Sequence, residues 1–146
     1  MIQTDLLHEH LENAISKLHL LITFTQEDIE DIKQAKHDSI FSRNNDKVCI
    51  IKEFEIAKNM IDKEMLTLTQ NNPHLSLTDI LDEKSNLLLS NMRKTLENLK
   101  KINTHYARMV FAVSEFYTSI TDKLIPREKA DYKSRVEQSQ LLKVQA

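Results

Sequence analysis

Residues 88–120 read LLSNMRKTLENLKKINTHYARMVFAVSEFYTSI, and this stretch decides the fold class of the chain. Apolar or near-apolar residues recur in alternating steps of four and three, which is the repeat of a helix that winds against other helices. Neither Gly nor Pro interrupts the pattern before Pro126. The pattern predicts one helix over residues 78–124, roughly 70 Å long, whose seam only long neighbouring helices or another chain could cover. The seam residues are Leu88, Met92, Thr95, Leu99, Ile102, Tyr106, Met109, Val113, Phe116 and Ile120.

The composition favours an all-helical fold. The chain has 146 residues, enough for one domain with a modest core, and it contains no Gly. Hairpin turns and phosphate-binding loops use positive φ angles, so a β-rich or α/β protein without Gly is hard to build. We therefore predict an all-α fold, an antiparallel bundle of about three long helices with coiled-coil-like packing and a flexible C-terminal tail.

Charge and apolar runs bear on where the protein acts. The formal net charge of −2 excludes a strong global attraction to nucleic acid, and Lys100-Lys101 is too small a basic patch for it. The single Cys49 cannot form an internal disulfide, which suits a reducing compartment. The N-terminal residues do not match a secretory signal, and the longest apolar runs are too short to span a bilayer. These features predict a cytoplasmic protein.

Two further helices precede the long one. The first is predicted over residues 4–36, with Thr4 as its N-cap, and it is acidic because residues 1–36 hold seven acids and three lysines. The second is predicted over residues 45–70, after a connection at 37–46 rich in Asp, Ser and Asn, although it could already start at Asp38. Asn71-Asn72-Pro73 stops it, and Ser76 or Thr78 caps the third helix.

The predicted domain organisation is a helical bundle over residues 1–125 and a mobile tail over residues 126–146. The tail is mildly basic, with five Lys or Arg against three acids, and apolar residues return only near its end. That end could fold back on the bundle, bind a partner, or have no role. Within the bundle, we expect Asp at Val113 or Phe116 to cause unfolding, because a buried unpaired charge is costly.

Catalytic and metal chemistry is mostly missing from the sequence. Of the six histidines, only His8 has a carboxylate three residues earlier, at Asp5, and one such pair is not a di-metal cluster. Cys49 lies among apolar residues and is expected to be a small buried hydrophobe. The acidic pairs Glu27-Asp28 and Glu30-Asp31 are interpreted as a solvated helix face. We predict a protein that is not an enzyme and needs neither cofactor nor metal.

Three stretches carry a family resemblance. They are a second helix with Lys followed by apolar residues, a leucine-then-asparagine stretch in the third helix, and a tyrosine-containing tail with a short apolar-basic end. The chain resembles in these places the FlgN-type flagellar type III export chaperones, which are small helical proteins of the bacterial cytoplasm. Tyr132 is followed by Lys133, where relatives often have Gly. The residues concerned are Lys47, Ile50, Ile51, Phe54, Lys58, Leu96, Leu99, Asn103, Tyr132, Leu141, Leu142, Lys143, Val144, Gln145 and Ala146.

The resemblance implies a chaperone without ATPase activity. Its partners would be hook–filament junction proteins, whose terminal amphipathic helices it would bind before delivery to the flagellar type III secretion apparatus. An alternative is a coiled-coil assembly subunit, such as a homodimer or the rod-like component of the export apparatus. The candidate partner-binding residues are Tyr132, Val136, Leu141, Leu142 and Val144.

Overall fold

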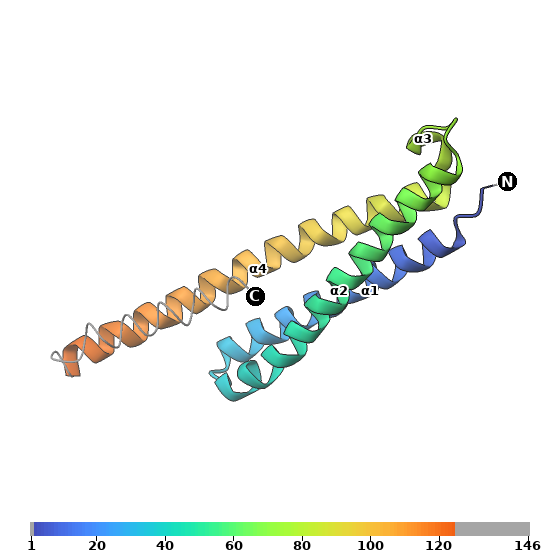
Figure 1. The fold of residues 1–146 in the computed structure, drawn as a ribbon. Helices are drawn as coiled ribbons and strands as arrows, with labels where there is room; N and C mark the ends of the chain where they lie inside the picture. Colours follow the sequence, from blue (N-terminus) through green and yellow to red (C-terminus); the bar gives the residue numbers. More distant parts are fainter. Residues whose placement is uncertain (1, 125–146) are drawn as a thin grey trace.

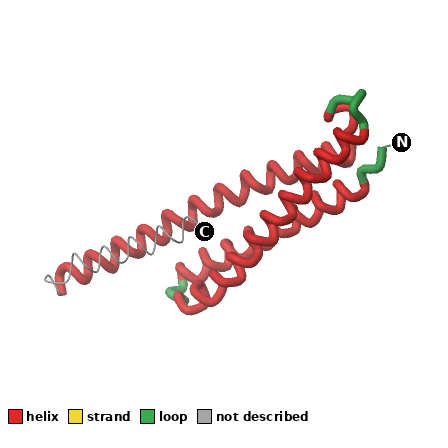
Figure 2. The backbone as a smooth tube through the Cα atoms, in the orientation of Figure 1, coloured by secondary structure: helices red, strands yellow, loops and turns green. Residues whose placement is uncertain are grey.

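The computed structural model describes residues 2–124 of the chain, and they form helices joined by short connections. The helices are α1 (Asp5–Lys33), α2 (His37–Asn71), the short α3 (Leu77–Ile80) and α4 (Glu83–Leu124). Figure 1 shows the three long helices lying alongside one another, and Figure 2 shows that the described part contains no strand. The predicted all-α fold with three long helices is confirmed.

The helix α1 is the central element of the bundle. Both α2 and α4 pack against it, whereas α2 and α4 contribute side chains to common clusters without close approach of their backbones. The chain runs up, down and up again, so α2 is antiparallel to its neighbours and α4 is parallel to α1 (Figure 1). The apolar face of α1 must therefore be wide enough to cover two neighbours.

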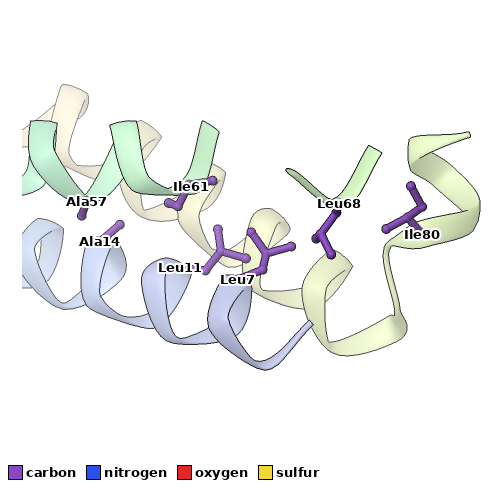
Figure 3. Close-up of a cluster of buried hydrophobic side chains, with 7 residues drawn as sticks. All are labelled: Leu7, Leu11, Ala14, Ala57, Ile61, Leu68 and Ile80. Atoms are coloured by element: carbon purple, nitrogen blue, oxygen red, sulfur yellow. The ribbon is translucent and has the colours of Figure 1, made fainter. Parts of the chain in front are cut away.

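The main apolar cluster lies where α1, α2 and α3 meet. Leu7, Leu11 and Ala14 of α1 point toward Ala57 and Ile61 of α2, and all five are fully or almost fully buried (Figure 3). Leu68 and Ile80 extend the cluster toward the end where the chain turns into α4. Leu88, Leu89 and Met92 of α4 pack against it, half-buried. This cluster attaches the beginning of α4 to the bundle.

The turn between α1 and α2 uses a left-handed residue. Ala35 has a φ of 58°, and it follows the C-cap residue Gln34. The amide of Ala35 donates to the carbonyl of Ile32, and the amide of Lys36 donates to that of Asp31, which is the Schellman pattern at a helix end. The prediction that the first helix runs to residue 36 was therefore too long, because the chain leaves the helix at Gln34.

We predict that Ala35→Gly stabilises the protein by roughly 0.5–1 kcal/mol, because Gly removes the Cβ penalty of a left-handed conformation. Urea unfolding followed by circular dichroism measures the change. The matched variant is Ala57→Gly, inside α2 and almost fully buried, which should destabilise by at least about 1 kcal/mol. Equal losses for both variants would show that Ala35 is not strained.

A buried ion-pair cluster fixes the first turns of α2 on α1. The Asp28 carboxylate, 1% exposed, accepts hydrogen bonds from Arg43 and from Lys47, the latter at 2.8 Å. Arg43 also pairs with Asp31 at 2.9 Å and with Glu27 at 3.0 Å. Burial opposes the charge of Arg43, but its hydrogen bonds to Asp28 and Asp31 outweigh that effect and raise its pKa.

Two predictions from the sequence fail at this cluster. The paired acids are not simply a solvated face, because Asp28 is buried and Asp31 is held by Arg43. The predicted start of the second helix at residue 45 is also wrong. The helix begins at His37, close to the alternative start at Asp38, because these ion pairs hold Arg43 and Lys47 on α1 in a helical conformation. Lys47 also lies over the Tyr106 ring of α4, 5.1 Å from its centroid. The cluster thus connects all three long helices.

We predict that Asp28→Asn destabilises the protein by about 2–3 kcal/mol, because it leaves Lys47 and part of Arg43 without a buried counter-charge. Thermal or urea unfolding at neutral pH measures the loss. The control is Glu27→Gln, whose side chain is half exposed and whose loss should stay below about 1 kcal/mol. Similar effects of both changes would contradict the assignment of Asp28 as the centre of the cluster.

The predicted helix over 78–124 is interrupted near its start. Ser76 caps the short α3, and its side chain and that of Asp79 form a reciprocal capping box. Leu81 is then extended, and Asp82 accepts the amide of Ser85 at 2.8 Å at the start of α4. The prediction of an uninterrupted helix from residue 78 was therefore wrong, because the chain leaves α3 at its C-cap residue Leu81 and Asp82 then caps α4.

Candidate partner-binding surface on the long helix

The far end of α4 continues beyond the turn that joins α1 and α2 (Figure 1). The last α4 residues that pack against the cluster of Ile29, Ile40 and Tyr106 are Met109 and Val110. Beyond them the seam pattern continues unchanged in the sequence, with Val113, Phe116 and Ile120. Within the described residues, the apolar seam of α4 therefore extends past the residues that pack on this cluster.

Four residues of this end form what we call the distal surface: Val113, Phe116, Tyr117 and Ile120. Phe116 is 63% exposed and Ile120 is 39% exposed, although both occupy seam positions. The Phe116 and Tyr117 rings meet edge to face with centroids 6.1 Å apart, and Tyr117 meets the His37 ring at 6.4 Å. Exposed aromatic side chains held by ring contacts are typical of surfaces that bind another protein.

The opposite end of α4 is locked in register with α1. The Thr4 hydroxyl donates to Asp82 at 2.8 Å, and the buried His8 Nε2 lies 3.0 Å from Asp82 Oδ1 and 2.9 Å from Ser85 Oγ. Thr4 precedes α1 as predicted, but its hydroxyl contacts Asp82 instead of capping its own helix. These bonds fix how far α4 slides along α1, and hence how much of α4 extends beyond it.

Side-chain hydrogen bonds from Ser85 and His8 hold the pKa of Asp82 well below its usual range. Because this pKa is lowered in the folded state, the carboxylate stabilises the fold above the unfolded pKa of about 3.9 and ceases to do so as pH falls further. We predict that Asp82→Asn lowers the melting temperature by a few degrees at pH 7, and that the difference shrinks below about pH 4.

A pH series of thermal unfolding curves tests this pH dependence. The control is Asp62→Asn, an exposed position on α2, which should change the melting temperature little at any pH. A deficit of Asp82→Asn that persists undiminished in acid would show that the carboxylate charge is not what stabilises this end.

The residues predicted from the sequence to bind a partner or to lie in the core differ in whether the structure describes them and in how exposed they are. Tyr132, Val136, Leu141, Leu142 and Val144 lie outside the described residues. Val113 is half-buried, whereas Phe116 is largely exposed, so the assumption that Phe116 is buried, on which its predicted unfolding by Asp rested, is wrong. Tyr117 belongs to the distal surface and His37 contacts its ring, but neither had a signal in the seam pattern because neither occupies a seam position.

Other candidate chemistry is limited within residues 2–124. No group of three or more His, Cys, Asp or Glu side chains there could hold a metal ion. The pairing partner of His8 is Asp82, not Asp5. Cys49 is exposed, contrary to the buried position expected, because it lies on the side of α2 away from α1. No helix of the described part is long and apolar enough to cross a membrane.

Comparisons with known proteins give no match on which a function could be based. No protein-family model, no curated protein and no solved structure matches this chain. The all-α class and the exposed end of α4 are therefore the observations from which a function is argued.

Proposed function

We propose that the protein is a helix-binding export chaperone of the cytoplasm, and specifically a FlgN-type flagellar chaperone. In this role it binds the C-terminal amphipathic helices of hook–filament junction proteins and delivers them to the flagellar type III secretion apparatus. The observation that carries the proposal is the distal surface, where Phe116 and Ile120 occupy seam positions but are exposed, and no helix within residues 2–124 covers them. The resemblance of the sequence to FlgN-type chaperones supplies the identity of the clients.

The geometry suits a transient complex. A client helix laid along the distal surface would extend the packing that α1 already makes with the earlier part of α4. Burial of apolar area contributes roughly 25 cal/mol per Å², and the cost of ordering an unfolded client reduces this gain. Because the surface is small, the affinity should be modest, which permits release at the export apparatus.

We predict that fluorescence anisotropy with labelled C-terminal segments of hook–filament junction proteins gives a dissociation constant of tens of micromolar or lower. Phe116→Asp should weaken binding by roughly tenfold or more, with circular dichroism and melting temperature nearly unchanged. The matched control is Ile56→Asp, equally exposed on α2 at 62%, which should leave binding intact.

Two results would contradict this function. If no client segment binds, the chaperone role is wrong. If light scattering instead shows a tight dimer that Phe116→Asp dissociates, the distal surface joins two copies, as in the coiled-coil assembly subunit. Changing Leu141, Leu142 and Val144 to Ser in the same assay separates a contribution of the C-terminal end from that of the distal surface.

A further inference from the structure

A second surface lies along the middle of α4, on a different side from the distal surface. It is a groove, here called the middle groove, lined chiefly by Leu96, Leu99, Lys100, Asn103, Ala107 and Phe111. Because a helix turns by about 100° per residue, Leu96, Ala107 and Phe111 lie about a quarter turn or more from the centre of the seam. The middle groove is therefore offset from the face that packs on α1, and the two share only the seam residue Leu99.

The floor of the middle groove is largely apolar and has small side chains at its centre, so another helix could pack closely against it. Leu96 is 39% exposed and Phe111 is 56% exposed, so each end of the groove presents a large apolar side chain. Between them lie the smaller Asn103 and Ala107. A floor of small residues between large apolar ones allows the backbone of another helix to approach, with its apolar side chains resting against Leu96 and Phe111.

The margin of the groove is basic. Residues 93–108 contain five Lys or Arg and a single acid, Glu97. Lys100, Lys101, His105 and Arg108 line an adjoining hollow together with Glu97. This concentration contrasts with the net charge of −2 for the whole chain and with the acidic α1.

The cations at this margin are not used to hold the fold. Arg43 and Lys47 are each paired with carboxylates of α1, and Lys17 and Lys84 pair with glutamates. Within residues 2–124, by contrast, the positive charges beside the groove form no ion pair with an acidic side chain. The residues concerned are Lys100, Lys101 and Arg108.

We propose that the middle groove binds an acidic amphipathic helix of a partner protein. The partner's apolar side chains would rest on Leu96 and Phe111, and its Glu or Asp side chains would face Lys100, Lys101 and Arg108. The apolar floor favours a protein helix over a nucleic acid, whose backbone needs cations but no apolar stripe. This proposal goes beyond the chaperone function, because it concerns a different side of α4 and a partner defined by charge.

The test uses the full-length protein and two synthetic peptides of about 20 residues, each with the same leucine spacing of an amphipathic helix. One peptide carries Glu at the flanking positions and the other carries Lys. The acidic peptide should bind at least roughly tenfold more tightly at low salt, and raising the salt to about 0.3 M should reduce that preference.

Variants locate the binding site. Lys100→Glu combined with Lys101→Glu should weaken binding of the acidic peptide roughly tenfold and strengthen binding of the basic peptide. The matched control is Lys52→Glu combined with Lys58→Glu, two exposed lysines of α2, which should change neither. Phe111→Ser should weaken binding of both peptides, whereas Phe116→Asp should change the binding of neither. This difference separates the middle groove from the proposed client site.

Several results would overturn the proposal. Equal affinity for the two peptides, or equal effects of the α4 and α2 charge reversals, would show that the groove does not select acidic helices. A dimer that is dissociated by the α4 charge reversal would assign the groove to a second copy of the chain. Tighter binding of a single-stranded oligonucleotide than of the acidic peptide would assign it to nucleic acid. Loss of client binding with retained peptide selectivity would refute only the chaperone function.

Discussion

The structure depends on one helix that is covered on two sides. Because α1 packs against both α2 and α4, its buried residues extend from Leu7 to Ile29 and include the polar Thr25 and Asp28. In α2 the buried residues form only a narrow stripe that faces α1. The loss of α1 would therefore remove the shared partner of the other two long helices, whose backbones do not approach each other closely.

Polar interactions set the register that apolar packing leaves open. A heptad seam can slide by a turn with little loss of contact, because successive turns present similar apolar side chains. Here the hydrogen bonds of Thr4 and His8 with Asp82 fix one end, and the Asp28 cluster fixes the other. Tyr106 of α4 lies under Lys47 of this cluster, and its burial together with the nearby Asp28 charge raises its pKa to about 12. The length of α4 that stays uncovered follows from this register.

Within the described residues, α4 presents two kinds of exposed surface. The distal surface continues the seam and offers aromatic groups held by ring contacts with His37. The middle groove faces another direction and combines Leu96 and Phe111 with a basic margin. The two surfaces differ in charge, and the partners proposed for them differ accordingly in chemistry.

The sequence alone determined the all-α class and the three long helices, because hydrophobic periodicity and the lack of Gly are local properties of the chain. It also contained the signal of Asp82 as a helix cap, which a continuous periodic pattern obscured. The early start of α2, the buried Asp28 and the contact of His8 with Asp82 were decided only by the tertiary structure. Each depends on residues far apart in the chain, and ion pairs or hydrogen bonds between helices override the local preference for a turn, a solvated acid or an exposed histidine.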